Sequence, residues 1–184
     1  NHYYNKSISK LKSDYSKNKS LDNIYTNRMI RLINGRNNRI TDYFNRVCHL
    51  LVNICIDNGV TTLVIGYNKG QKQDINLGVI NNQKIVSIPY HKFRQKLEQL
   101  CVEHGISYIS QEESYTSKAS ALDMDVIPTY GVDESPTTFS GKRIHRGLYR
   151  SSDGNVLNAD INGSINILRK YVKERNENWI YQDS

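Results

Sequence analysis

The sequence predicts an α/β fold in which long helices accompany a small number of β-strands. Two short runs, TTLVIGY (residues 61–67) and ISYISQEE (106–113), are rich in β-branched and aromatic residues and read as strands. A segment with helical apolar spacing lies between them. A strand–helix–strand order predicts a parallel strand pair with a crossover helix. The 184 residues are enough for one domain with an appendage.

The first third of the chain predicts helices. Residues 1–19 are polar, with Ile8 and Leu11 as the only aliphatic residues, and fit a frayed helix or a linker. Residues 21–33 predict a helix, which we expect to break at NGRNN (34–38) because Gly and Asn disfavour helix interiors. A stronger apolar stripe begins at Ile40, and Asn58-Gly59 supplies a stop signal for the helix.

The remaining segments alternate between loops and helices. Residues 68–84 form a polar loop that is too long for a plain connection. Pro89 opens a second helix, which ends at His104-Gly105. Residues 114–158 show no clear periodicity and predict an irregular insertion, whereas 158–174 predict an amphipathic helix followed by a polar tail.

Charge is divided unevenly along the chain. The net charge is +7, but residues 1–100 carry 16 Lys and Arg against 6 Asp and Glu, and residues 101–184 carry 9 against 12. A basic front half and a pI near 9.3 make nucleic acid the leading class of partner. Among the aromatic residues, 13 are Tyr, which suits stacking surfaces. The alternative is a soluble basic protein without such a partner.

Several classes are excluded or disfavoured. No apolar run approaches the roughly 18 residues that a membrane span requires, and the polar start NHYYNKSISK is no secretory signal. Cys48, Cys55 and Cys101 have no Cys-x-x-Cys spacing, so we expect buried hydrophobic side chains rather than zinc ligands. An odd cysteine count without an export signal fits a reducing cytosol, and we expect a cytoplasmic protein without a membrane partner.

Acidic residues at two element ends are candidates for chemistry. Glu112 and Glu113 close the second predicted strand, where α/β sheets bind ligands. Asp160 starts a helix, and it either caps that helix or joins a strand-end glutamate as a ligand for Mg²⁺ or Mn²⁺. Two such ions could assist phosphodiester hydrolysis. The spacing in sequence does not decide between these alternatives.

Several motifs resemble one family. The strings QEESYTSKAS, FSGKRIHRGLYRSSDG and NADINGSINILRK resemble the C-terminal half of TnpB/OrfB proteins from bacterial insertion sequences, which are similar to RuvC-like nucleases of type V CRISPR effectors. The upstream strings LVIGYNKG and IPYHKF support the resemblance, which covers about residues 20 to 172.

The resemblance implies an RNase H-like (RuvC-type) fold and a metal-dependent, RNA-guided DNA endonuclease, with DNA and guide RNA as partners. It also implies three active-site acids, of which Asp160 matches the third. Many members end the central strand with Glu, where this chain has Gly66. Another branch places this Glu just before YTSK, which corresponds to Glu113, with Glu112 as its rival. Neighbouring strand residues face opposite sides, so only one of the two can face the metals.

Two departures from the family pattern are visible. The strand that carries the first acid is missing, so we expect a C-terminal portion or a truncated gene product that is inactive alone, with Glu113 and Asp160 holding a metal weakly or not at all. The Cys pairs of the family's zinc ribbon are also missing, because the corresponding places read AS-AL and RSSDG. We therefore expect no zinc, and an insertion that either keeps its shape through hydrogen bonds and packing or moves.

Combining both lines of argument, we predict a basic helical region (1–58), a RuvC-like partial sheet (59–113 and 159–175), a zinc-less insertion (114–158) and a tail (176–184). Basic side chains along the chain are candidates for phosphate contacts: Arg28, Arg31, Arg36, Arg39, Arg46, Lys69, Lys72, Lys118, Lys142, Arg143 and Arg146. The alternative function is a transposon-derived protein that binds nucleic acid without cutting it.

Overall fold

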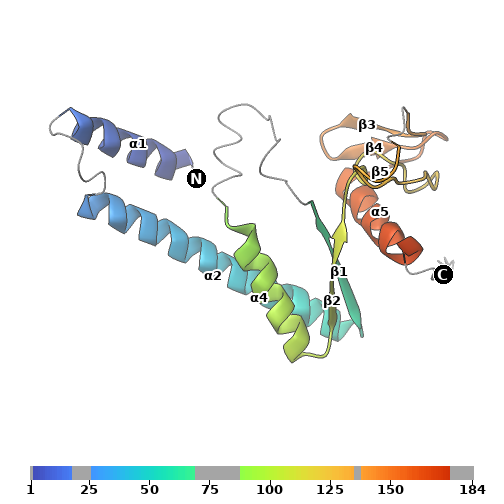
Figure 1. Cartoon of the computed structure of the whole chain (residues 1–184), viewed down its shortest axis with the longest axis horizontal. Coiled ribbons are helices and arrows are strands. Elements are labelled where there is room, and N and C mark those ends of the chain that lie inside the picture. The colour runs from blue at the N-terminus through green and yellow to red at the C-terminus, as the bar shows by residue number, and fades with distance from the viewer. Residues whose placement is uncertain (1, 18–25, 69–87, 135–137, 175–184) are drawn as a thin grey trace. The chain divides into compact units, whose positions relative to one another are not determined.

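A computed structural model describes residues 2–17, 26–68, 88–134 and 138–174 (Figure 1). The chain divides into two compact units. A helical unit comprises Asn1–Val60 and Lys72–Gly105, and a mixed unit comprises Thr61–Gln71 and Ile106–Ser184. The predicted loop at 68–84 lies outside the described residues apart from Asn68, as do Lys69, Lys72 and the tail from residue 175 onwards.

The helical unit contains α1 (His2–Ser16), α2 (Asn27–Asp57) and α4 (Tyr90–Glu103). Its core lies where α2 packs against α4. The Phe44 and Phe93 rings approach to 5.4 Å between centroids, and the Cys48 thiol points at the Phe93 carbonyl oxygen, 3.6 Å away. Apolar side chains from both helices complete this core: Val52, Cys55, Leu97, Leu100 and Cys101.

Helix α2 corrects one prediction. It runs through residues 34–38 without the expected break, from a Thr26 cap whose hydroxyl accepts a hydrogen bond from the Met29 N–H (3.3 Å). Gly35 costs about 1 kcal/mol relative to Ala, which buried Met29 before it and Phe44 after it can offset. The predicted stop is confirmed, since the Asn58 side chain donates to the Ile54 carbonyl oxygen (2.8 Å) and Gly59 adopts a positive φ of 64°.

The mixed unit contains the predicted parallel pair. Strand β1 (Thr62–Tyr67) pairs with β2 (Ser107–Glu112), in a register that places Gly66 beside Gln111 and Tyr67 beside Glu112. Helix α5 (Ala159–Glu174) contacts both strands. The parallel pairing and the helix after residue 158 are therefore confirmed. Every β1 residue is half-buried, whereas a buried strand was expected.

Part of the predicted irregular insertion is regular. Three short antiparallel strands, β3 (Lys142–His145), β4 (Leu148–Arg150) and β5 (Val156–Asn158), form a meander in that order (Figure 1). The β3–β4 turn uses Gly147 at a φ of 84°, and the β4–β5 turn uses Gly154 at 86°. Strands of three or four residues are too short to show an alternating pattern in the sequence.

Hydrogen bonds join the two segments at which the resembled family has cysteines. Asp123 accepts from the backbone (3.0 Å) and the hydroxyl (2.6 Å) of Ser152, which follows β4. Asp125 accepts from the buried Ser120 N–H (2.8 Å) and from the Ser140 hydroxyl (2.5 Å). The insertion thus keeps its shape through hydrogen bonds, which is one of the two alternatives expected.

The expected burial of the cysteines is confirmed, because all three are buried, and none of them is in a disulfide. Burial raises the pKa of both Cys48 and Cys101, which keeps these thiols protonated at neutral pH. Among the helices of the described residues, none combines the length and the apolar character that crossing a bilayer requires.

Candidate functional site

The candidate site begins where the two parallel strands end. Gln111 is buried, and its amide donates to the Glu174 carboxylate of α5 (2.9 Å). One residue beyond the strand, the Glu113 N–H donates to the Tyr67 carbonyl oxygen (3.2 Å), which continues the β1–β2 ladder. Glu112 and Glu113 are therefore both held at the carboxyl edge of the pair, where parallel sheets place ligand-binding groups.

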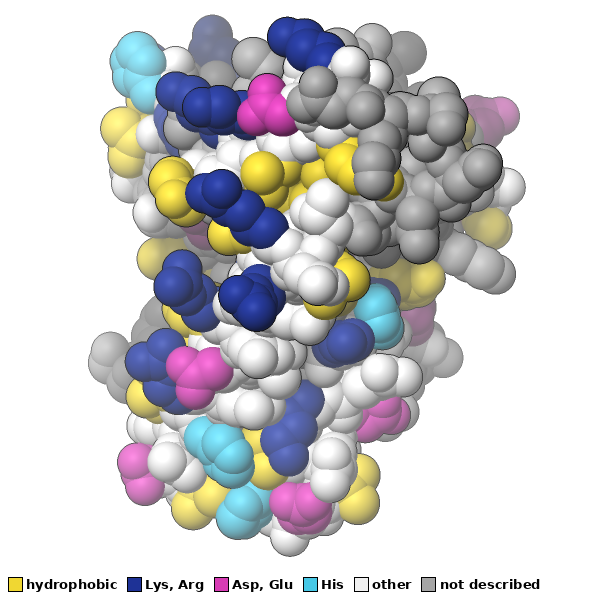
Figure 2. Space-filling model, turned by 90° about the vertical axis from the view of Figure 1, so that its left-hand side faces the viewer, with side chains coloured by type: hydrophobic (Ala, Val, Ile, Leu, Met, Phe, Trp, Pro, Cys, Tyr) yellow, Lys and Arg dark blue, Asp and Glu magenta, His cyan; other side chains and the backbone are white. Residues whose placement is uncertain are grey.

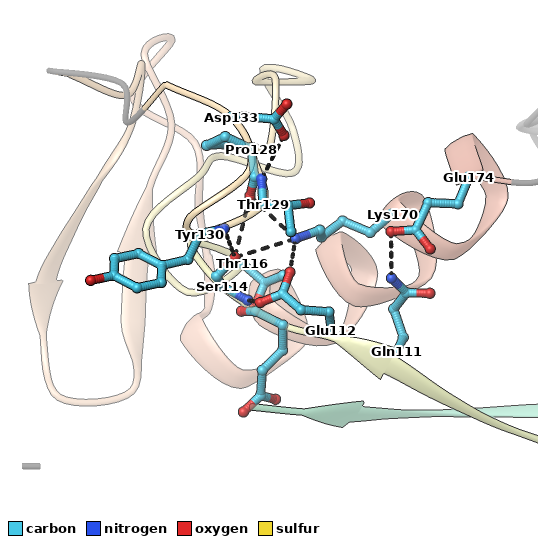
Figure 3. A network of polar contacts seen from close by, with 11 residues as sticks. Gln111, Glu112, Ser114, Thr116, Pro128, Thr129, Tyr130, Asp133, Lys170 and Glu174 are labelled. Carbon is cyan, nitrogen blue, oxygen red and sulfur yellow. Dashed lines mark hydrogen bonds and ion pairs between the residues drawn. The ribbon is translucent and has the colours of Figure 1, made fainter. Parts of the chain in front are cut away.

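Glu112 forms an ion pair with Lys170 of α5 (Figure 3). The Lys170 side chain is 3% exposed and that of Glu112 is 31% exposed. The Glu112 carboxylate also accepts from the Ser114 N–H (2.5 Å), and the Lys170 ammonium also donates to the Pro128 carbonyl oxygen (3.2 Å). A buried ammonium requires such partners, so this pair ties the end of β2 and the loop at Pro128 to α5.

The ion pair determines the charge state of Glu112. Burial by itself raises the pKa of this carboxyl, but hydrogen bonds from Lys170 and Ser114 outweigh burial and the pKa is lowered. Glu112 is therefore a carboxylate at neutral pH whose oxygens already accept hydrogen bonds from protein groups.

The Glu113 carboxylate and the Ile167 side chain both lie beside Gly66. A Cβ atom placed on Gly66 would come closer than 3.0 Å to both the Glu113 carboxylate and the Ile167 side chain. Glu113 and Ile167 thus fill the space that a side chain at position 66 would occupy. The chain has Gly66 at the place where many resembled proteins have Glu, and the Glu113 carboxylate lies beside that place.

Asp160 is exposed in the first turn of α5. Of the two alternatives for Asp160, capping is wrong, because the Asn158 side chain caps the helix by accepting from the Asp160 N–H (2.8 Å) and the Ile161 N–H (3.2 Å). Asp160 precedes Ile167 by seven residues, or about two helical turns, on the same face of α5. That face is the one that reaches Gly66 through Ile167.

Two buried asparagines of α5 form contacts that the sequence did not reveal. Asn162 donates to the Ala119 carbonyl oxygen (2.8 Å) and accepts from the Ala121 N–H (2.9 Å). Asn166 donates to the carbonyl oxygens of Thr116 (2.9 Å) and Ala119 (2.8 Å). These bonds hold the YTSKAS segment on α5. The only sign of these contacts in the sequence was the spacing of Asp160, Asn162 and Asn166. That spacing is equally typical of a polar helix face.

The basic candidates fall into both units. Arg28, Arg31, Arg36, Arg39 and Arg46 all lie on α2. Arg46 forms an exposed ion pair with Asp42 (2.9 Å), and the Arg36 guanidinium lies over the Tyr4 ring at 5.0 Å from its centroid. Figure 2 looks onto the end where α1 and the start of α2 lie, and shows Lys and Arg side chains among hydrophobic ones.

The other described candidates belong to the mixed unit. Lys142 and Arg143 are exposed on β3, and Arg146 is exposed in the turn that follows. The Lys118 ammonium lies 5.8 Å from the centroid of the Tyr115 ring. Within the residues that the structure describes, no group of three or more His, Cys, Asp or Glu is arranged to hold a metal ion.

Comparisons with known proteins agree with the motifs. A family model described as a probable transposase, OrfB_IS605, matches residues 1–72, and a model of the Cas12f1-like TNB domain matches residues 90–167. No curated protein matches the sequence. A cryo-EM structure of a Cas12f1–sgRNA–target DNA complex matches with a TM-score of 0.58 and 15% identity, over 90% of this chain and 41% of that one.

These matches define a class of transposase-related proteins whose fold is similar to that of Cas12f1. Together, the matches support a similarity of this chain to TnpB-like proteins of the OrfB/IS605 type. It spans about two fifths of the length of the matched Cas12f1 chain.

Proposed function

We propose that the chain contributes to a TnpB-like, RNA-guided DNA endonuclease with a RuvC-type, RNase H-like core. Glu113 and Asp160 are the proposed metal ligands. One observation carries the proposal: the Glu113 carboxylate lies beside Gly66, at the place that Ile167 also reaches from the α5 face that bears Asp160. The parallel pair with α5 beside it is compatible with such a core.

The donor set suits a divalent ion. Carboxylate oxygens are the hard ligands that Mg²⁺ and Mn²⁺ prefer, and the two residues come from the end of a parallel pair and the start of a helix. When bound, such ions activate water and stabilise the leaving oxygen of a phosphodiester. Glu112 is the less suitable ligand, because Lys170 and Ser114 already occupy its oxygens.

The chain's own residues position these ligands. Lys170 keeps Glu112 against α5, and the Glu113 N–H holds the turn after β2 to Tyr67. Asn158 caps α5, which leaves the Asp160 carboxylate free of the capping role. The positive end of the helix dipole also favours a carboxylate at Asp160.

A cleavage assay tests this proposal. The full-length gene product, purified with its RNA, is incubated with DNA in the presence and absence of Mg²⁺ or Mn²⁺. We expect metal-dependent cleavage that Glu113→Gln and Asp160→Asn abolish, whereas Asp153→Asn, an exposed acid in the β4–β5 turn, retains it. Absence of cleavage by the unsubstituted full-length product, or cleavage that both substitutions leave unchanged, would contradict the endonuclease.

A second candidate function is nucleic-acid binding without cleavage. It is favoured by the concentration of five candidate Arg residues on α2, in a unit that holds neither proposed metal ligand. Binding to RNA or DNA that persists in Glu113→Gln and Asp160→Asn, without cleavage by the unsubstituted full-length product, would support this function over the first.

A further inference from the structure

We propose that the helical unit contains a pocket that binds an unpaired nucleotide of single-stranded RNA. The pocket lies between α1, α2 and α4, which all belong to that unit. This inference deepens the proposed function, on which the choice of RNA as ligand rests. It assigns base contacts to named tyrosines, whereas the sequence indicated only that its many tyrosines suit stacking surfaces and named only Lys and Arg side chains, for phosphate contacts.

The pocket has the size and the apolar base of a ligand site. Its volume is about 730 Å³, within the range of small-molecule pockets in proteins. Phe44 and Val47 of α2 and Phe93 of α4 contribute apolar lining, and the two phenylalanine rings are tilted by 56° to each other. The base of the pocket is therefore part of the packed core of this unit and is fixed by it.

Tyrosines from three helices surround this base. Tyr3 and Tyr4 come from α1, Tyr43 from α2 and Tyr90 from α4. Tyr43 is 59% exposed and Tyr90 is 47% exposed, so their rings are accessible to a ligand. Exposed aromatic rings stack on nucleobases of any sequence, and the tyrosine hydroxyls can hydrogen-bond to a ribose 2′-OH.

The charge of the lining selects an anionic ligand. Arg31, Arg36 and Arg39 line the pocket, and its described lining includes no Asp or Glu. Arg36 already lies over the Tyr4 ring, which shows that guanidinium and aromatic groups meet here. Guanidinium groups next to exposed rings match the phosphate and the base of one nucleotide. An apolar protein segment carries no anionic group that Arg31 and Arg39 could contact.

Fluorescence anisotropy with short labelled RNA oligomers tests the pocket. One RNA carries unpaired bases, and a second RNA of equal length is abasic, so that it has the same phosphates without rings to stack. A DNA oligomer of the same base sequence provides the comparison with RNA.

Two variants each remove a single feature of the pocket. Tyr43→Ala removes a ring, and Arg39→Gln removes a positive charge. Two controls lie outside the pocket: Tyr130→Ala, at a side chain 76% exposed in the mixed unit, and Arg28→Gln on α2.

We expect the unsubstituted chain to bind the base-bearing RNA more tightly than the abasic RNA and the DNA. Tyr43→Ala is expected to weaken binding of the base-bearing RNA by roughly tenfold and to leave the abasic RNA unchanged. Arg39→Gln is expected to weaken both and to lower the salt slope of log K by about 0.7. Tyr130→Ala should bind like the unsubstituted chain, and Arg28→Gln should keep its preference for bases over abasic RNA.

Three outcomes would overturn the inference. Normal binding of the base-bearing RNA by the Tyr43→Ala variant would show that the ring does not stack on a base. An apolar protein segment would then be the better occupant of the pocket. Equal binding of abasic and base-bearing RNA would exclude a base pocket, and equal binding of DNA would reject RNA as the ligand. Circular dichroism melts of each variant establish that folding is retained. If the chain does not bind RNA and the full-length gene product does not cleave DNA, the proposed function fails as well. RNA binding that is insensitive to Tyr43→Ala rejects the pocket alone.

Discussion

A side chain at position 66 would compete for space with the Glu113 carboxylate. Gly66→Ala places a Cβ within 3.0 Å of Glu113 and Ile167, so one or both side chains must move. Because both are flexible ends, we expect a loss of stability of only about 1 to 2 kcal/mol in denaturant unfolding. We also expect a clear loss of Mn²⁺ binding, measured by electron paramagnetic resonance.

Gly163→Ala is the matched control for this substitution. Gly163 lies within α5, three residues after Asp160, and a Cβ there meets nothing within 4 Å. Replacing a helical Gly with Ala should raise stability by about 0.5 to 1 kcal/mol without changing Mn²⁺ binding. Unchanged Mn²⁺ binding in Gly66→Ala would mean that the position of Glu113 is unimportant for a metal.

Glu112 offers a prediction about pH. Its pKa is lowered in the folded protein, so the stabilisation by its ion pair is present above the unfolded-state pKa and is lost as the pH falls through the folded-state value. Glu112→Gln leaves Lys170 buried without its counter-charge, and should cost roughly 1 to 3 kcal/mol at neutral pH. The difference between the two proteins should shrink below about pH 4.5, the ordinary value for Glu. A difference that stays constant from pH 7 to pH 3 would contradict this role of the ion pair.

At the scale of elements, strong local patterns were sufficient for prediction. The parallel strands, the helix opened by Pro89 and the stop at Asn58-Gly59 were predicted because each depends on residues close together in sequence. The break at 34–38 was wrongly predicted, because intrinsic propensity was outweighed by packing on both sides of Gly35.

The arrangement around the candidate site could not be derived from the sequence. Gly66 lies beside Glu113 only because of the β1–β2 register and the packing of α5. Asn158 caps α5, although Asp160 was the capping candidate in the sequence, because both residue types are good caps. The sequence therefore named Glu113 and Asp160 as candidates, but how they lie relative to Gly66 and α5 depends on contacts between distant segments.

The insertion after β2 leads to a prediction about metal. Asp125 accepts hydrogen bonds from the buried Ser120 and from Ser140, and its backbone carbonyl accepts from Arg169 of α5 (2.9 Å). Asp125→Ala removes the carboxylate acceptors, which should lower stability by roughly 1 to 3 kcal/mol. A zinc-selective chelator should leave the melting temperature of the unsubstituted chain unchanged. A fall in melting temperature with the chelator would show that a metal, rather than these hydrogen bonds, holds the segment.

At the scale of the whole molecule, the uneven charge separates two proposed tasks. The excess of Lys and Arg in residues 1–100 coincides largely with the helical unit, whereas Glu113 and Asp160 lie in the mixed unit. If the helical unit supplies the main phosphate contacts, neutralising Arg31, Arg36 and Arg39 together should lower the salt slope for single-stranded RNA by about 2. Neutralising Lys142, Arg143 and Arg146, which carry the same total charge on the meander, should lower it less. Anisotropy titrations across a salt series measure both slopes. An equal or larger reduction from the meander substitutions would place the main phosphate contacts in the unit that contains the proposed metal ligands, and would contradict the separation of binding from cutting.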